Sequence, residues 1–107
     1  MLASFLYHKN KPLETNISRA EMLATLQDKD CLLWVDLEDP NEFESDALVE
    51  IFNFHPLAVE DCISDLSQPK VDDYEEYLFL VMHAVNLKSE IQFSTIELDT
   101  FLGRNYV

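Results

Sequence analysis

The 107-residue sequence contains one glycine, two cysteines and only seven basic side chains. A single glycine leaves no room for the glycine-rich loops that hold phosphate groups, which excludes nucleotide-binding motifs of that kind. The cysteines, Cys31 and Cys62, lack C-x-x-C spacing, which predicts buried, reduced thiols rather than a disulfide framework or a cysteine metal motif. Seven basic against 21 acidic side chains give a net charge of −14, which argues against nucleic acid as a partner and disfavours an anionic membrane surface.

Long hydrophobic runs and catalytic motifs are also missing. The longest apolar run is Tyr77–Met82, whereas a membrane-spanning helix needs about 20 apolar residues. The sequence has no G-x-S-x-G elbow, and His8, His55 and His83 are not spaced as a metal-ligand pair. We therefore predict that the chain is not an enzyme. A small hydrolase that uses His55 or His83 with a nearby aspartate is kept as an alternative.

Hydrophobic periodicity predicts a single domain over residues 1–107, built of strands and helices. We expect strands at 2–7, 31–36, 74–87 and 91–102, a further strand starting at 104, helices at 18–27, 40–52 and 56–67, a turn or linker at 68–70 and a hairpin turn at 86–90. Strands 31–36, 74–87 and 91–102 are expected to share one mixed, largely antiparallel sheet. Helices packed on this sheet make the fold class α/β (α+β), a layered sandwich. Because the sequence stops within an expected strand, we expect it to be part of a longer protein.

Helix starts can be predicted residue by residue. Ser18 and Glu21 have the spacing of a capping box, Asp39 is the expected cap before Pro40, and His55 is expected to cap the helix that begins at the next proline. The helical side chains expected to face the core are Ala20, Leu23, Ala24, Phe43, Ala47, Leu48, Ile51, Phe52, Leu57, Ile63 and one of Ala58 or Val59.

Carboxylates are the candidate functional groups, because hard divalent cations prefer oxygen ligands. Asp61 and Asp65 are four residues apart and share a helix face, while Glu60 points about 100° away. One helix alone would hold a hydrated cation only weakly, and the alternative is a solvated acidic face. The acidic pairs 72–73 and 75–76 are expected to be solvated residues at the entry to a strand.

Five sequence blocks resemble, in their order and spacing, the N-terminal cytosolic part of the CorA family of magnesium and cobalt transporters. The blocks are W-x-D-L at Trp34–Leu37, H-P-L-A-x-E-D at His55–Asp61, Q-P-K-V at Gln68–Val71, Y-x-x-Y-L-F-L-V at Tyr74–Val81 and F-L-G-R-N-Y at Phe101–Tyr106. The resemblance covers about residues 31–107. At Gln68 the family usually has an arginine, so one cation of the pattern is absent here.

This resemblance implies a cytosolic regulatory domain of a divalent-cation transporter that works as a homopentamer on the cytoplasmic side of the inner membrane. It implies that Asp61 contributes to a cation site between protomers, that Glu60 lies at a neighbouring position, and that the partner ligands lie outside this chain. Mg²⁺ or Co²⁺ would be a weakly bound regulatory ion, with no tightly bound cofactor. The membrane would be reached only through C-terminal helices that the sequence does not contain.

Two alternatives stay open. The chain could play the same role in a zinc-transporting member of the superfamily, or it could be a stand-alone acidic module that binds other proteins.

Overall fold

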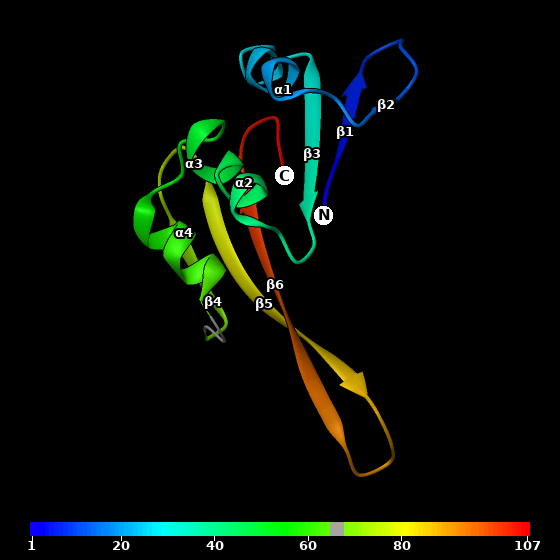
Figure 1. Cartoon of the computed structure of the whole chain (residues 1–107), viewed down its shortest axis with the longest axis vertical. Coiled ribbons are helices and arrows are strands. Elements are labelled where there is room, and N and C mark those ends of the chain that lie inside the picture. Colours follow the sequence, from blue (N-terminus) through cyan, green and yellow to red (C-terminus); the bar gives the residue numbers. More distant parts are fainter. Residues whose placement is uncertain (65–67) are drawn as a thin grey trace.

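A computed structural model describes residues 1–64 and 68–107 (Figure 1). The elements of these residues are β1 (Leu2–His8), β2 (Glu14–Thr15), α1 (Arg19–Leu26), β3 (Cys31–Leu37), α2 (Glu42–Ser45), α3 (Ala47–Glu50), α4 (Pro56–Ile63), β4 (Lys70–Asp73), β5 (Leu78–Leu87) and β6 (Phe93–Leu102). The predicted combination of helices with largely antiparallel strands is confirmed.

The strands of the described residues form two antiparallel sheets, ordered β2-β1-β3 and β4-β5-β6. The prediction that strand 31–36 shares one sheet with 74–87 and 91–102 was therefore wrong. β1 pairs with β3 along its whole length on one edge. On the other edge, the Leu33 amide donates to the Asn105 carbonyl at 2.8 Å, and the Val35 amide donates to the Val107 carbonyl at 2.9 Å. Both edges of β3 are thus occupied, which leaves no place for β5 or β6. The strand expected from residue 104 is a single parallel bridge between Leu33 and Tyr106.

β5 and β6 form a long hairpin that extends away from the body of the molecule (Figure 1). β4 begins at Lys70, the last residue of the turn or linker expected at 68–70, and pairs antiparallel with the start of this hairpin, with Lys70 opposite Val81. Phe79 and Val81 point to the core, whereas the side chains from residue 84 to residue 93 are exposed. The hairpin is therefore anchored by its base alone.

The predicted capping box of α1 is confirmed. Ser18 Oγ accepts from the Glu21 amide at 3.2 Å, and Glu21 Oε2 accepts from the Ser18 amide at 2.7 Å. The expected buried face was wrong, because α1 buries Met22 and Thr25. The residues expected there, Ala20, Leu23 and Ala24, are exposed.

The helix expected over 40–52 forms as two short helices, α2 and α3, and Asn41 rather than Asp39 caps the first of them. Asn41 Oδ1 accepts from the Glu44 amide at 2.9 Å, while Asp39 has a left-handed φ of 43°. A left-handed residue cannot enter a helix as its cap, which explains the shift. Phe43 is 68% exposed, contrary to expectation, and the Arg19 guanidinium lies 3.9 Å over its ring.

α4 begins as predicted, with His55 Nδ1 accepting from the Leu57 amide at 3.1 Å. Its buried residues are Ala58 and Val59, so the expectation that Leu57 and Ile63 face the core was wrong; Leu57 is 61% exposed. The part of this helix expected at 65–67 lies outside the described residues.

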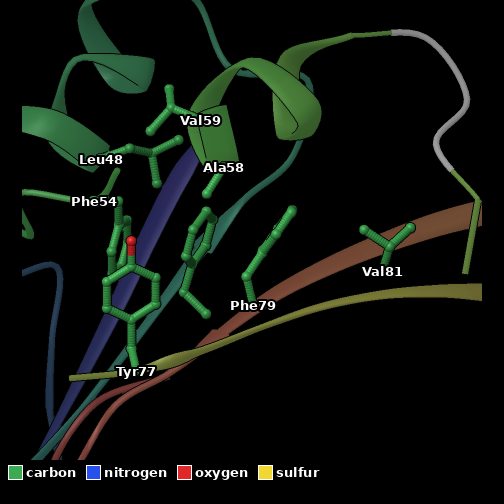
Figure 2. Close-up of a cluster of buried hydrophobic side chains, with 8 residues drawn as sticks. Leu48, Phe54, Ala58, Val59, Tyr77, Phe79 and Val81 are labelled. Carbon is green, nitrogen blue, oxygen red and sulfur yellow. The ribbon is translucent and has the colours of Figure 1, made fainter. Parts of the chain in front are cut away.

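The main core lies between α4 and the base of the β5–β6 hairpin (Figure 2). Phe54 and Phe79 both stack on Phe101, with ring centroids 3.9 and 4.7 Å apart. The Tyr77 hydroxyl accepts from the His55 amide at 2.8 Å, which ties the start of α4 to this core. A second cluster of Met22, Leu33, Ala47 and Ile51 joins α1, β3 and α3. Together these contacts set the position of α4 and of the carboxylates on it.

One face of the β1–β3 pair is apolar and exposed. Phe5 lies opposite Trp34, and Tyr7 opposite Leu32, and all four side chains are exposed. Exposed apolar patches of this kind mark surfaces that contact other proteins or other parts of one. Among the described residues, no helix is long and apolar enough to span a membrane.

Candidate metal centre

Asp61 lies in the last turn of α4, where its carboxylate contacts a lysine of β4. The distance from Lys70 Nζ to Asp61 Oδ2 is 2.5 Å, and the distance from the same ammonium to Asp72 Oδ2 is 2.9 Å. Lys70 thus bridges one carboxylate from a helix and one from a strand. Glu60, the other predicted ligand, is exposed on α4, and Asp65 lies outside the described residues.

The Lys70 ammonium is strongly stabilised in its charged form. The hydrogen bond to Asp61, followed by the one to Asp72, raises the pKa of Lys70 above its ordinary value. A divalent cation that reaches Asp61 must therefore share this carboxylate with the ammonium or displace it. Sequence reasoning missed Lys70 as part of the site and treated Asp72 as a merely solvated residue. The signal available was the Lys70-x-Asp72 spacing, which places both side chains on one face of a strand.

A second acidic group faces α4 from β6. Burial, followed by the charge of Glu97, raises the pKa of Asp99 to about 6. Burial, followed by the charge of Asp99, also raises the pKa of the Cys62 thiol to about 12, so this thiol holds its proton at neutral pH. The charge of Asp61 is a smaller cause of the raised pKa of Asp99.

A cleft of about 890 Å³ lies between β3, α4 and β6. Cys62, Glu97 and Asp99 are on its wall, together with apolar side chains. Asp99 and Glu97 were missed by the sequence analysis, although their i, i+2 spacing in a strand is visible in the sequence. His83 Nε2 is 3.5 Å from Glu97 Oε2, which agrees with the prediction of a histidine satisfied within the structure. His55 Nδ1 is engaged as a helix cap.

Chemically, the arrangement is a set of oxygen ligands at one end of α4, partly neutralised by an internal ammonium. Oxygen donors suit hard divalent cations and offer little to softer ones. Asp61 and Asp72 converge on the same position, whereas Glu60 is not part of this contact.

Known proteins resemble this chain in sequence and in fold. A family model described as "CorA-like Mg2+ transporter protein" matches residues 29–107. A protein of Bacillus subtilis (strain 168), named "Putative metal ion transporter YfjQ", is 42% identical over 74 residues, which are 69% of this chain and 22% of that protein. The chain thus spans less than a quarter of the length of this relative.

The fold has a counterpart of known structure. The soluble domain of CorA from Methanocaldococcus jannaschii matches with a TM-score of 0.67 and 19% sequence identity, over 99% of this chain and 38% of that one. This match supports the expected fold class of helices with largely antiparallel strands.

Proposed function

The chain belongs to the CorA-like Mg²⁺ transporter family, and on this premise we propose that it forms part of the cytosolic domain of a divalent-cation transporter. In this role it neither transports nor catalyses by itself. It regulates, because it carries carboxylates that respond to the concentration of Mg²⁺ or Co²⁺ on the cytoplasmic side of the membrane. The relative named above is described as a metal ion transporter, which supports the same cargo class for this protein.

The observation that carries the proposal is the contact of Asp61 with Lys70. Asp61, Lys70 and Asp72 form a site that is already arranged for a cation and is occupied by an internal one. A divalent cation replaces the ammonium at Asp61 when further oxygen ligands arrive from a neighbouring protomer of a homopentamer. Glu60 is the exposed residue before Asp61, and it adds negative charge to the surface that the divalent cation approaches. Because this chain supplies only part of the ligand shell, binding is weak, with a dissociation constant on the order of millimolar.

Charge and surface character support an interface. Acidic surfaces with a net charge of −14 per chain repel each other, and a divalent cation shared between them reduces that repulsion at the point of contact. The exposed apolar face with Phe5, Tyr7, Leu32 and Trp34 offers additional contact area to the rest of the assembly. The side chains that meet at Lys70 are carboxylates, which favours Mg²⁺ over zinc at this position; Co²⁺ is kept as the other candidate on the family resemblance alone.

The test uses the protein at its natural length and measures its protection from limited proteolysis as Mg²⁺ is added. Asp61→Asn should raise the half-maximal Mg²⁺ concentration by about tenfold, because it removes a ligand charge. Lys70→Gln should lower that concentration by about threefold to tenfold, because it removes the competing ammonium. Asp36→Asn, which changes an exposed aspartate on β3, is the matched control and should leave the curve unchanged.

Opposite shifts for Asp61→Asn and Lys70→Gln are the specific expectation. If both variants behave like Asp36→Asn, Asp61 is not a regulatory ligand. If Mg²⁺ does not change the proteolysis of the unmodified protein, the regulatory role itself is refuted. That result would favour the alternative of a stand-alone module that binds other proteins.

A further inference from the structure

Three side chains with different donor atoms meet at the other sheet, away from the carboxylates of α4. His8 ends β1, Asp28 lies in the turn after α1, and Cys31 begins β3. One ligand atom from each lies within 4.8 Å of the others. His8 and Cys31 are directly opposite each other in the β1–β3 register, so the sheet itself brings the imidazole and the thiol together.

The imidazole is oriented by the backbone. His8 Nδ1 is 3.1 Å from the carbonyl oxygen of Lys9. Because a carbonyl can only accept, Nδ1 carries the proton, and Nε2 presents its lone pair in the neutral ring. A histidine that ligates a metal through one nitrogen typically donates its other ring N–H to such a partner.

The carboxylate is oriented in the same way. Asp28 Oδ1 accepts from the Asp30 amide at 3.0 Å, while Oδ2 accepts from the Cys31 thiol at 3.3 Å and lies 3.8 Å from His8 Nε2. The Asp30 amide, and after it the Cys31 thiol, holds the pKa of Asp28 below its ordinary value. Asp28 is therefore a charged ligand with one oxygen directed at the other two donors.

The turn that carries Asp28 is held from two sides. The Asp28 amide donates to the Thr25 carbonyl at 3.0 Å. The Asp28 carbonyl accepts from Asn105 Nδ2 at 3.0 Å and from the Cys31 amide at 3.3 Å. These bonds fix the turn against the end of α1 and against the C-terminal segment. The three donors are thus placed by backbone contacts that do not depend on a metal.

Hydrogen bonding alone does not account for the arrangement. The separation of 3.8 Å between His8 Nε2 and Asp28 Oδ2 is too long for a hydrogen bond. It is close to the spacing of about 3.3 to 3.6 Å between two ligands of a tetrahedral Zn²⁺, and the distance of 3.3 Å from Asp28 Oδ2 to Cys31 Sγ fits as well. A cation between the three donors would replace the proton that the Cys31 thiol donates to Asp28 Oδ2 and would bond to His8 Nε2, which now lies 3.8 Å from that oxygen.

We propose that His8, Asp28 and Cys31 form a binding site for a borderline transition-metal cation, Zn²⁺ above all, separate from the carboxylate site at Asp61. A mixed nitrogen, oxygen and sulfur donor set selects Zn²⁺ or Co²⁺ over Mg²⁺. Burial, followed by the hydrogen bond to Asp28, raises the pKa of the Cys31 thiol, so the metal must displace this proton to solvent before the thiolate bonds to it. The side chains of His8 and Asp28 are 31% and 46% exposed, which gives the cation a path in and leaves the fourth position to water.

The test loads the reduced protein, at its natural length, with Co²⁺ as a spectroscopic stand-in for Zn²⁺. A thiolate bound to Co²⁺ gives a charge-transfer absorption band in the near ultraviolet, which carboxylate and imidazole ligands do not give. The band should be present in the unmodified protein and in Cys62→Ser, and absent in Cys31→Ser. Cys62→Ser is the matched control because it removes the other free thiol.

Zn²⁺ affinity is measured in parallel by competition with a chromophoric chelator. His8→Ala and Asp28→Asn should each weaken binding by about tenfold or more, whereas Asp61→Asn should leave it unchanged. His8 and Asp28 are partly exposed, so these variants keep the test valid even if Cys31→Ser, which changes a buried residue, disturbs folding.

A missing charge-transfer band, a band lost with Cys62→Ser, or affinities of His8→Ala and Asp28→Asn within twofold of the unmodified protein would each overturn the proposal. None of these outcomes depends on the response to Mg²⁺, so the two sites are tested independently.

Discussion

Asp99 on β6 is expected to make the protein less stable at neutral pH than at mildly acidic pH. Its Oδ1 is a buried oxygen for which the described residues provide no hydrogen-bond partner. Burial, and then the charge of Glu97, raises the pKa of this carboxyl to about 6 from an ordinary value of 3.8. The folded protein therefore binds this proton more tightly than the unfolded chain does.

The sign and size of the effect follow from proton linkage. Between about pH 4 and pH 6 the folded state holds more protons at this position than the unfolded state, so the free energy of unfolding falls as the pH rises. A difference of about two pKa units corresponds to about 3 kcal/mol. Since Asp99 is partly exposed and solvent screens its charge, we expect about 1 to 2 kcal/mol.

Asp99→Asn tests this directly, because asparagine imitates the protonated carboxyl and has no charge to bury. We expect the variant to gain about 1 to 2 kcal/mol over the unmodified protein between pH 4 and pH 7, with a plateau above pH 7. The measurement is urea unfolding at a series of pH values, with Asp36→Asn as the control for removing one charge from an acidic chain. A difference that stays constant with pH, or that falls as the pH rises, would refute the reasoning.

Two further substitutions test the packing around the site by urea unfolding at constant pH. Gly103→Ala should destabilise the fold by about 1 to 3 kcal/mol, because an added Cβ would lie 2.2 Å from the Tyr106 ring; unchanged stability would mean that the ring moves aside freely. Phe79→Ala should cost about 3 to 5 kcal/mol, because Phe79 is fully buried and stacks on Phe101, whereas Leu57→Ala on the exposed side of α4 should cost far less.

Two helix caps could be predicted from the sequence, whereas the face that α1 buries could not. The capping box of Ser18 with Glu21 and the cap by His55 depend on residues within a few positions of each other, and both are confirmed. Which face of α1 is buried depends on β3 and α3, which pack against Met22. Neighbouring apolar residues such as Met22 and Leu23 offer the helix two plausible faces, and only the tertiary contact decides between them.

The division into two sheets could not be predicted either, because it depends on pairings distant in sequence. The C-terminal residues Asn105 and Val107 occupy the free edge of β3, which lies some seventy positions earlier in the chain. Apolar runs predict that strands exist, but they carry no information on which edges are already taken.

The candidate sites, too, depend partly on local sequence and partly on contacts between distant residues. Asp61 was a candidate ligand as a helical carboxylate, the family resemblance supplied its interface role, and that role stays a prediction. Its contact with Lys70 depends on β4, a strand that the sequence analysis did not predict. The group of His8, Asp28 and Cys31 has no ligand spacing in the sequence. It exists because the antiparallel register places residue 8 opposite residue 31. Motifs are defined by short spacings along the sequence, so they cannot identify a pair that only strand pairing brings together.

The donor chemistry of the two sites gives them different tasks on our proposals. At Asp61 an incoming cation competes with an ammonium that is held by two carboxylates, so part of its binding free energy is spent on displacing Lys70, and occupancy changes only at high cation concentration. At Cys31 no charged side chain has to leave, and the sulfur and nitrogen donors favour a borderline cation that Mg²⁺ cannot replace. A weak oxygen site and a selective mixed-donor site can therefore respond to two cations in one small domain without interfering. Lys70→Gln should strengthen the response to Mg²⁺ and leave Zn²⁺ binding unchanged, which separates the two sites in a single variant.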